Sequence, residues 1–214
     1  MQIVTETIFI ENEKFLLTNQ RALFWEQESA LVLSDLHIGK TAHFRKNGIA
    51  IPKNVLKKDL YRLEALINCF APSNILINGD LIHAGYNSDV EEFCKFKQRF
   101  PMINYHLIQG NHDRLTKDIR ENLSLDSIQG SLQIRNILLT HEFDNVTDKF
   151  QINGHIHPGI LLKTPIKNIK LPCFAVSERQ MLLPAYSEFT GLDVVNIPKR
   201  SDFYIFTDEI ILKV

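Results

Sequence analysis

Hydrophobic and polar residues alternate over the first part of the chain, and short, almost wholly apolar runs follow. Residues 2–10 and 14–25 have a two-residue period around a Glu-Asn-Glu break, which predicts an antiparallel hairpin at a sheet edge. Apolar runs at 30–34, 74–78 and 103–109 each stop at turn residues. Runs of this length, bounded in this way, predict buried strands.

Helical periodicity fills the intervals between these runs. Residues 53–70 place leucines and other apolar side chains three or four positions apart, with Lys57 and Lys58 on the opposite face. A second helix is predicted over 89–100, where Pro101 stops it. Strand, helix and strand in succession predict a βαβ crossover and a parallel pair of strands.

The second half of the chain has the pattern of further strands. They are predicted at 132–140, 149–153, 170–176, 203–206 and 209–214. We expect the last three to be antiparallel and to belong to a second sheet. The 214 residues carry no linker, repeat or low-complexity tract, which predicts an α/β fold in one domain, residues 1–214.

Composition narrows the choice of environment and partners. The net charge is -1, so no global basic field draws the chain to nucleic acid. The three cysteines have no C-x-x-C spacing, which is against a disulfide framework or a thiolate zinc site. The N-terminus lacks the pattern of a signal peptide, and no apolar segment approaches the ~20 residues of a membrane span. We therefore expect a soluble, cytoplasmic protein without a membrane partner.

Side chains of metal-ligand type follow one predicted strand after another. These residues are Asp35, His37, Asp80, Asn111, His141, His155 and His157. In α/β sheets ligands bind beyond the carboxyl ends of the strands, and residues two apart at a strand end point the same way. One such segment is weak evidence, because a Gly-Asp turn or an isolated D-x-H is common. Five segments in succession favour a metal centre over packing.

The donors are oxygen and nitrogen without thiolate, which suits Mn, Fe or Zn, with Mn²⁺ preferred here. They are too many for one ion, and they divide naturally in two. One ion would take Asp35, His37, an oxygen of Asp80 and one terminal histidine. The other would take the second oxygen of Asp80, Asn111, His141 and the other histidine. Two ions ~3.5–4 Å apart, bridged by a carboxylate, clamp a phosphoryl group and supply hydroxide near neutral pH.

Further polar residues surround these positions. His112 follows Asn111, and with Asp113 to steer it the imidazole is suited to move protons. The segment 38–46 is basic: its Lys40, His43 and Arg45 either form a solvated loop face or line the rim of a phosphate-binding cleft, and we favour the rim. His83 lies either at the cleft edge or away from it as a packed or solvated histidine, and we favour the second interpretation.

The motifs Asp35-x-His37, Gly79-Asp80, Gly110-Asn111-His112-Asp113, His141 and Gly154-His155-x-His157 together resemble the calcineurin-like metallophosphoesterase superfamily. The resemblance implies a two-sheet β-sandwich flanked by helices in four layers, α/β/β/α. It implies that Asp80 bridges the two metals, that His155 joins the Asn111 metal and that His157 joins the Asp35 metal. It also implies that His112 contacts the substrate and assists the leaving group, while Asp113 orients it.

A narrower resemblance depends on the segments around the centre. The residues are Asp35-Leu36-His37-Ile38-Gly39-Lys40, Phe44-Arg45, Gly48-Ile49-x-Ile51-Pro52, Leu183-Pro184-Ala185 and Phe189-Thr190-Gly191. They are similar to the bacterial PdeM-type phosphoesterases, described as ligase-associated DNA damage response endonucleases. That group often has a second glycine where this chain has Leu192. The resemblance implies a DNA substrate, a link to DNA repair and a functional association with a ligase or helicase system.

The expected activity is hydrolysis of phosphodiester bonds by hydroxide held between two divalent metal ions, and the narrower resemblance implies that the substrate is DNA. A phosphatase or phosphodiesterase for a nucleotide or another small molecule is the first alternative. A scaffold that kept the fold and lost turnover is the second. A homo-oligomer is left open, as are the native substrate and the role of residues 183–191.

Overall fold

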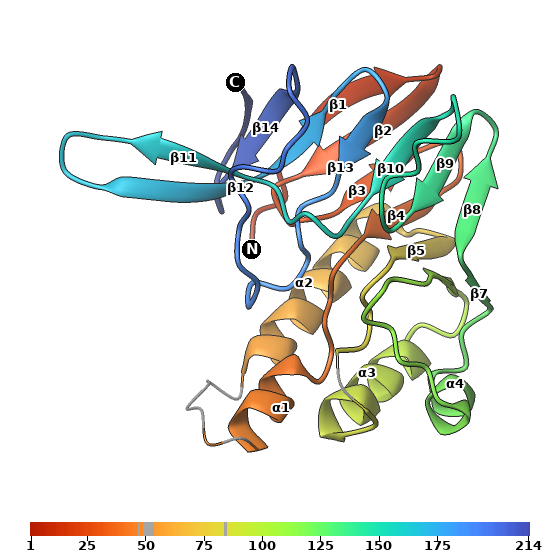
Figure 1. Cartoon of the computed structure of the whole chain (residues 1–214). Coiled ribbons are helices and arrows are strands. Elements are labelled where there is room, and N and C mark those ends of the chain that lie inside the picture. The colour runs from red at the N-terminus through yellow and green to blue at the C-terminus, as the bar shows by residue number, and fades with distance from the viewer. Residues whose placement is uncertain (47, 49–53, 84) are drawn as a thin grey trace.

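The computed structural model of the chain describes residues 1–46, 48, 54–83 and 85–214 (Figure 1). Ile49, Ile51 and Pro52, part of the narrower resemblance, lie outside the described residues, as does the predicted start of the first long helix. The helices are α1 (Lys40–Lys46), α2 (Val55–Phe70), α3 (Ser88–Gln98) and α4 (Lys117–Leu123). No helix in the described ranges is long and apolar enough to cross a membrane.

Strands from the first part of the chain form the first sheet, and they are hydrogen-bonded in chain order. They are β1 (Thr5–Ile10), β2 (Glu13–Thr18), β3 (Leu23–Trp25), β4 (Ala30–Leu33), β5 (Asn74–Asn78), β6 (Asn104–Ile108) and β7 (Ser127–Gln129). Strands β1 to β4 are antiparallel, and β4 to β7 are parallel. The predicted crossover through α2 and the parallel pair β4 and β5 are confirmed.

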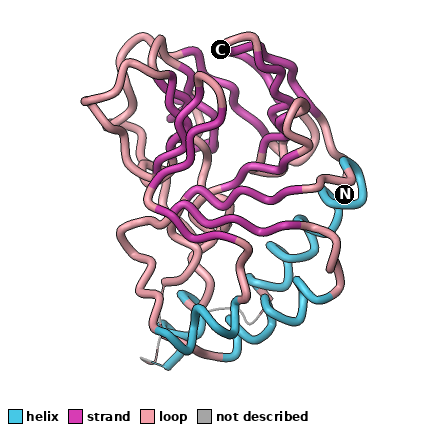
Figure 2. The backbone as a smooth tube through the Cα atoms, turned by 90° about the vertical axis from the view of Figure 1, so that its right-hand side faces the viewer, coloured by secondary structure: helices cyan, strands magenta, loops and turns pink. Residues whose placement is uncertain are grey.

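The second sheet has the order β15-β14-β12-β13-β10-β9-β8, and β11 pairs with β12 beside it. Its strands are β8 (Ser131–Ile134), β9 (Ile137–Thr140), β10 (Phe150–Asn153), β11 (Gly159–Lys163), β12 (Asn168–Val176), β13 (Gln180–Leu182), β14 (Asp202–Phe206) and β15 (Ile211–Lys213). The pairs of β10 with β9 and with β13 are parallel. This sheet stacks on the first, and Figure 2 shows both in side view above the helices.

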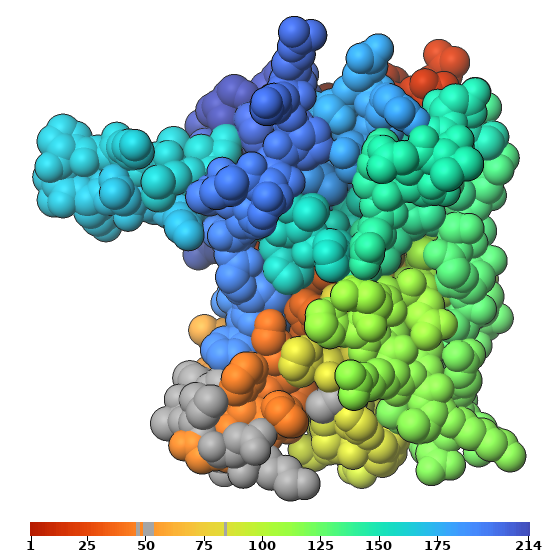
Figure 3. Space-filling view, viewed as in Figure 1, coloured from red at the N-terminus to blue at the C-terminus, as the bar shows by residue number. Residues whose placement is uncertain are grey.

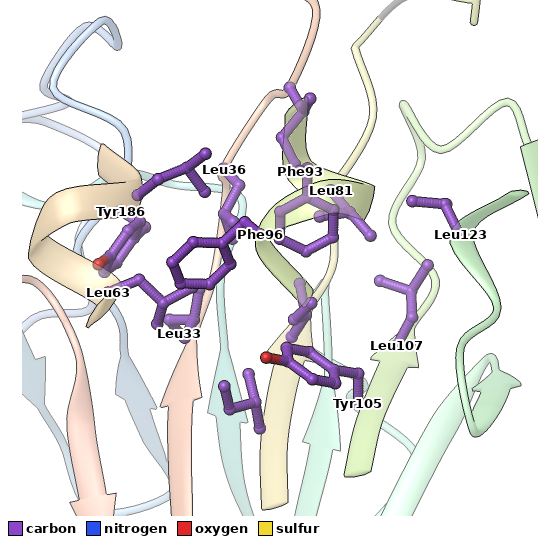
Figure 4. Packing of buried hydrophobic residues seen from close by; sticks show 14 of the residues in the cluster. Leu33, Leu36, Leu63, Leu81, Phe93, Phe96, Tyr105, Leu107, Leu123 and Tyr186 are labelled. Carbon is purple, nitrogen blue, oxygen red and sulfur yellow. The ribbon is translucent and has the colours of Figure 1, made fainter. Parts of the chain in front are cut away.

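The apolar runs of the central strands serve two hydrophobic cores at once. In β4, Leu31 and Leu33 point to α2 and α3, whereas Val32 points to the second sheet. Strand β5 repeats the division, with Leu76 on the inter-sheet side. Because alternate residues face opposite sides of a strand, a strand covered on both faces needs apolar residues throughout. Figure 4 shows the helix-side core, in which Leu33, Leu63, Phe93 and Leu107 lie together.

The predicted two-sheet sandwich flanked by helices is confirmed. Its described helices contribute to the core on the outer face of the first sheet, and the core between the sheets is built from strand and loop residues. The second helical layer of the predicted α/β/β/α order therefore has no helix among the described residues.

Turns divide two segments that the sequence predicts as single strands. The backbone at Arg21 and Arg135 has a positive φ, 62° and 52°, which breaks residues 14–25 into β2 and β3 and residues 132–140 into β8 and β9. The predicted second helix begins one residue earlier, because the Asn87 side chain caps it by accepting from the amides of Asp89 and Val90. Helices α1 and α4 and the three-residue strands β7 and β13 are not predicted, because none is long enough to show a period. Strand β11 is not predicted either.

Candidate metal centre

The carboxyl ends of parallel strands from both sheets meet at one place. Asp35 lies just beyond β4 and Asp80 beyond β5, while His141 and His155 follow β9 and β10 in the second sheet. Asn78 ties the two sheets together there, because its side-chain amide donates to the carbonyls of Thr140 at 3.1 Å and Ile152 at 2.8 Å. The ends of β5, β9 and β10 are thus held in fixed relation.

Left-handed backbone is concentrated in the predicted ligands. Their φ angles are 58° at Asp35, 48° at His37, 51° at Asp80, 67° at His155 and 54° at His157. Each residue of this kind costs on the order of 1–3 kcal/mol unless the surroundings impose it, and such residues cluster at functional sites. The chain turns sharply at every one of these strand ends, which aims the side chains inward.

Glycines in three of the motifs permit close approach of these segments. A Cβ at Gly79 would lie 2.0 Å from Nδ1 of His141, and one at Gly110 would lie 2.4 Å from Oδ1 of Asp80. A Cβ at Gly154 would lie 1.8 Å from the hydroxyl of Ser34. The glycines are therefore required by packing around the acids and the imidazole, and Gly79 also has a φ of 88°.

A first group of ligand atoms belongs to Asp35, His37 and His157, all within 4.8 Å of one another. Oδ1 of Asp35 lies 3.0 Å from Nε2 of His157 and 3.9 Å from Nε2 of His37. Its other oxygen, Oδ2, accepts from the Ser34 hydroxyl at 2.6 Å and the His155 amide at 3.2 Å. One oxygen of Asp35 is thus fixed by the protein, and the other points at the ring nitrogens.

A second group consists of Asp35, Asp80 and His141, again within 4.8 Å. Nε2 of His141 lies 3.3 Å from Oδ1 of Asp80 and 3.9 Å from Oδ1 of Asp35. Its Nδ1 lies 2.8 Å from the carbonyl of Asn78, which fixes the proton on Nδ1 and directs Nε2 at the acids. The member shared by both groups is Asp35, and the bridging role expected of Asp80 stays a prediction.

The residues fit divalent cations. Buried atoms without a hydrogen-bond partner converge here: Oδ1 of Asp35, both ring nitrogens of His37, and Nε2 of His141 and of His157. Unpaired buried polar atoms are costly, and these are the oxygen and nitrogen donors that Mn, Fe and Zn accept. The part of the chain that the structure describes therefore has two overlapping candidate sites.

The pKa shifts in the centre also indicate that its carboxylates favour a positive charge beside them. Burial raises the pKa of the Asp80 carboxyl, but His141 and the amide of His112 outweigh it and hold the pKa at about 2. Burial would lower the pKa of His141, yet Asp80 and Asp35 raise it to about 9. Burial holds the pKa of His37 at about 4 despite Asp35, so its ring is neutral and available as a ligand at pH 7.

The other two predicted ligands border these groups. The ring of His155 lies 5.3 Å from that of His141, centre to centre, and its Nδ1 is 3.9 Å from Oε1 of Glu142. Asn111 is exposed in the loop that follows β6. The same loop is joined to Asp80, whose Oδ1 accepts from the His112 amide at 3.0 Å. Both residues thus lie at the solvent side of the centre.

The two predicted catalytic residues differ in environment. The His112 side chain is exposed, with its ring 6.1 Å from that of His37. Asp113 is buried, and its two oxygens accept from the amides of Ile82 at 2.9 Å and Gly110 at 2.8 Å. The bond to Gly110 closes the turn that carries His112, and the bond to Ile82 ties this turn to the segment after β5. Any orienting effect of Asp113 on the imidazole therefore acts through the loop.

The three predicted rim residues lie on α1. Lys40 is half-buried, and burial lowers its pKa while Asp35 and Asp80 oppose the shift, which places its charge near the acids. His43 is exposed, with its ring 6.3 Å from that of His83. Arg45 instead pairs with Asp89 of α3 at 3.7 Å, and Thr41 donates to the same carboxylate. Lys40 and His43 therefore face the centre, whereas Arg45 secures α1.

Sequence patterns miss several residues that build the centre. His83 lies at the cleft edge rather than packed or solvated elsewhere, because the centre of its ring is 5.6 Å from that of His37 and 5.8 Å from that of His112. Ser34, just beyond β4, and Asn78, the last residue of β5, are ordinary polar residues that no sequence pattern distinguishes. Residues 183–187 run beside the end of β4, since the amides of Tyr186 and Ser187 donate to the carbonyls of Ser34 and Asp35. Of these residues only His83 could have been recognised from the sequence, because histidine is a residue type typical of metal and catalytic sites.

Fold and site together define a metal-dependent phosphoesterase. The sequence model of calcineurin-like phosphoesterases matches residues 29–174, and the chain belongs to this family. The crystal structure of Pseudomonas putida nuclease MPE is similar, with 26% identity, a TM-score of 0.82 and coverage of 94% of this chain and 96% of the nuclease.

A phosphoesterase from E. coli, Yfce, aligns with 12% identity and a TM-score of 0.43 over 85% of this chain and 90% of its own. No curated protein sequence matches the chain.

Proposed function

We propose that this protein is a two-metal phosphodiesterase that cleaves polynucleotides, DNA first, and that it acts in DNA repair. The observation that carries the proposal is the likeness to a nuclease over 94% of the chain, combined with converging donor atoms at the same strand ends. We further propose that residues 1–214 act as one domain, since both sheets contribute to the centre.

The proposed ligands divide as the motifs indicate. Asp35, His37 and His157 hold one cation, and Asn111, His141 and His155 hold the other, with Asp80 between them; Mn²⁺ suits these donors, as do Fe and Zn. When bound, the two cations lower the pKa of a coordinated water and draw charge from the phosphoryl oxygens.

The chain's other residues position the substrate and move protons. His112 is exposed beside the centre and is suited to donate a proton to the leaving oxygen, with the loop held by Asp113. Lys40 carries the charge suited to a phosphate oxygen, because its ammonium is partly desolvated near Asp35 and Asp80. His83 packs against both His37 and His112 and restrains their rings.

Hydrolysis of bis-p-nitrophenyl phosphate with added Mn²⁺ tests the proposal. The wild-type protein should turn over this diester, and Asp80→Asn should lower kcat/KM by roughly 100-fold or more, since one ligand charge is lost. Asp208→Asn is the matched control, because this exposed acid lies in a turn of the second sheet. Equal rates for wild type and Asp80→Asn would refute the two-metal account.

The net charge of -1 favours a second candidate, a diesterase for a nucleotide or another small molecule, because the whole chain does not attract polyanions. A screen over single-stranded DNA, duplex DNA, RNA and cyclic nucleotides separates the two. Turnover of cyclic nucleotides alone would replace the nuclease proposal with this one.

A further inference from the structure

A two-stranded arm leaves the body of the molecule directly beyond the last predicted ligands. It consists of β11, the part of β12 that pairs with β11, and the turn between them, and Figures 1 and 3 show it projecting from the body of the molecule. The rest of β12 pairs with β13 and β14 in the second sheet. Residues 162–168 are exposed, and Ile166 at the tip is 94% exposed. An extension of this kind contributes little to either core, so its shape calls for another explanation.

The arm is basic. Residues 159–176 contain Lys163, Lys167 and Lys170 and no Asp or Glu, in a chain whose total charge is -1. Local clusters of this kind are the means by which a near-neutral protein attracts a polyanion.

Register sorts the charges onto one face. Lys163 pairs with Asn168, and Leu161 pairs with Lys170. Since residues that face each other across an antiparallel pair share a side, and alternate residues along a strand do too, Lys163, Asn168 and Lys170 lie on one face, together with Leu161. Leu162 and Ile169 lie on the other. The arm is therefore amphipathic, with its lysines grouped.

The lysine face borders the metal centre at its base, through Lys170. A hollow of about 660 Å³ is lined by Lys170, by His155 and His157, and by the loop 191–196 opposite. One proposed ligand from each cation site and one lysine of the arm thus border the same space. Asp193, an acid in this hollow, turns its carboxylate to its own loop, where it accepts from the amides of Val195 and Asn196.

The base of the arm is fixed to the ligand segment. The Gly159 amide donates to the carbonyl of Asp193 at 2.9 Å, and the Asp193 amide donates to the carbonyl of His157 at 3.0 Å. A Cβ at Gly159 would lie 2.9 Å from that of Leu192, so Leu192, where the resembling group often has glycine, packs directly on this base. The arm therefore holds a constant direction relative to His157.

We propose that the arm binds the phosphate backbone of a polynucleotide where the strand passes out of the metal centre, with Lys163 and Lys170 contacting successive phosphates. This rests on the proposed function and specifies how its site takes an extended substrate. The occupant is a polynucleotide rather than a second copy of this chain, because the face turned to the centre is cationic and the whole chain is slightly anionic.

The test compares two substrates of different length. The double variant Lys163→Gln/Lys170→Gln and the control Lys14→Gln/Lys95→Gln lose the same charge, but neither control lysine lines the hollow. Each is assayed with Mn²⁺ on bis-p-nitrophenyl phosphate and on oligodeoxynucleotides, single-stranded and duplex, over a range of salt. The first substrate has no phosphate that reaches the arm.

The arm variant should keep wild-type hydrolysis of bis-p-nitrophenyl phosphate. Its kcat/KM on the oligonucleotide should fall roughly 5-fold for each lysine at about 0.1 M salt, and the salt slope should weaken by about 1.4, since each single-strand phosphate contact contributes about 0.7. Asn168→Lys, on the same face, should act in the opposite direction. The control pair should match wild type on both substrates.

Equal oligonucleotide kinetics in the arm variant and the control would refute the proposal that the arm binds the polynucleotide, and would leave the phosphodiesterase proposal intact. A wild-type protein that hydrolyses bis-p-nitrophenyl phosphate but no oligonucleotide would also overturn it. Inactivity on every diester would refute both proposals. A dimer that the arm substitutions dissociate would identify the arm as a subunit contact, again contrary to the proposal.

Discussion

Two clusters of charged side chains in this protein differ in how their acids are neutralised. In the first, Arg62 of α2 donates to Asp59 at 2.6 Å and to Glu188 at 2.9 Å, and its guanidinium stacks 4.6 Å above the ring of Tyr186. In the second, Asp35 and Asp80 face the imidazoles of His141 and His157, whose Nε2 atoms lack hydrogen-bond partners. The first cluster contains its own cation. The second has donors aimed at a common space, which marks it as a binding site.

The comparison between the two clusters requires that the Arg62 cluster stabilises the fold. Arg62→Met leaves Asp59 as a buried charge without the guanidinium that it pairs with, and the free energy of unfolding should fall by about 3–5 kcal/mol. Urea denaturation followed by circular dichroism measures it. Asp59→Leu/Arg62→Met, which removes both charges, should recover most of the loss. A single variant as stable as wild type would mean that the ion pair contributes nothing.

Asp113 is an intermediate case, a buried carboxylate satisfied by amides. Asp113→Asn would turn an NH₂ toward the amide of Ile82 or Gly110, which should cost about 1–3 kcal/mol of unfolding free energy. Because the loop carries His112, kcat on bis-p-nitrophenyl phosphate should fall roughly 10-fold as well. Thermal melts and steady-state kinetics give both values. Lost stability with unchanged kcat would restrict Asp113 to folding.

The dependence of stability on pH sharpens the contrast. The folded pKa of His141 is about 9 against an ordinary 6.5, so its contribution is complete below pH 6.5 and is lost as pH rises toward 9. The folded pKa of Asp80 is about 2 against an ordinary 3.8. Its contribution to stability is therefore complete above pH 3.8 and is lost as pH falls toward 2.

In the presence of a chelator, the Tm should therefore decline between pH 6.5 and 9, and His141→Gln should flatten this decline. With Mn²⁺ added, the affinity for metal should rise over the same range, because the imidazole must lose its proton to bind. Titrations of Tm with and without Mn²⁺ measure both. A chelated protein whose Tm rises from pH 6.5 to 9 would contradict the assignment.

The smallest expected effect separates two residues of α1. Lys40→Ala should raise the KM for bis-p-nitrophenyl phosphate about 10-fold and leave the Mn²⁺ content unchanged. The substitution removes an ammonium group that would contact the phosphate, but it removes no metal ligand. Arg45→Ala should change KM less, because the side chain pairs with Asp89. Measuring the Mn²⁺ content together with the kinetics shows whether Lys40 acts on the substrate or on metal binding. Release of Mn²⁺ by Lys40→Ala would disprove its role at the rim.

The strand ends of the centre can be predicted from sequence because their signals are local. An apolar run such as 74–78 predicts a strand, and an acid such as Asp80 directly behind it is visible without any knowledge of the fold. Two such features in sequential parallel strands meet at one edge of a sheet. The same holds for the two-residue spacing of Asp35 and His37.

The parts that escape prediction depend on contacts between distant segments. Asn78 reaches residues 62 and 74 positions away, and Tyr186 reaches back to Ser34, although neither stretch is unusual in composition. Helix α4, with seven residues, is too short for its period to stand out. The pairing of Arg45 with Asp89 likewise needs the packing of α1 beside α3, which no local pattern encodes.

The left-handed turns at Asp35, His37, Asp80, His155 and His157 have a consequence for protein engineering. Aspartate, asparagine, histidine and glycine enter this conformation more readily than other residues, so even an Asp35→Glu exchange would meet a backbone unsuited to the longer acid. A designer who grafted the same side chains onto another parallel sheet with ordinary loops would aim them elsewhere. What has to be copied to rebuild this centre is the main chain, and the side chains follow from it.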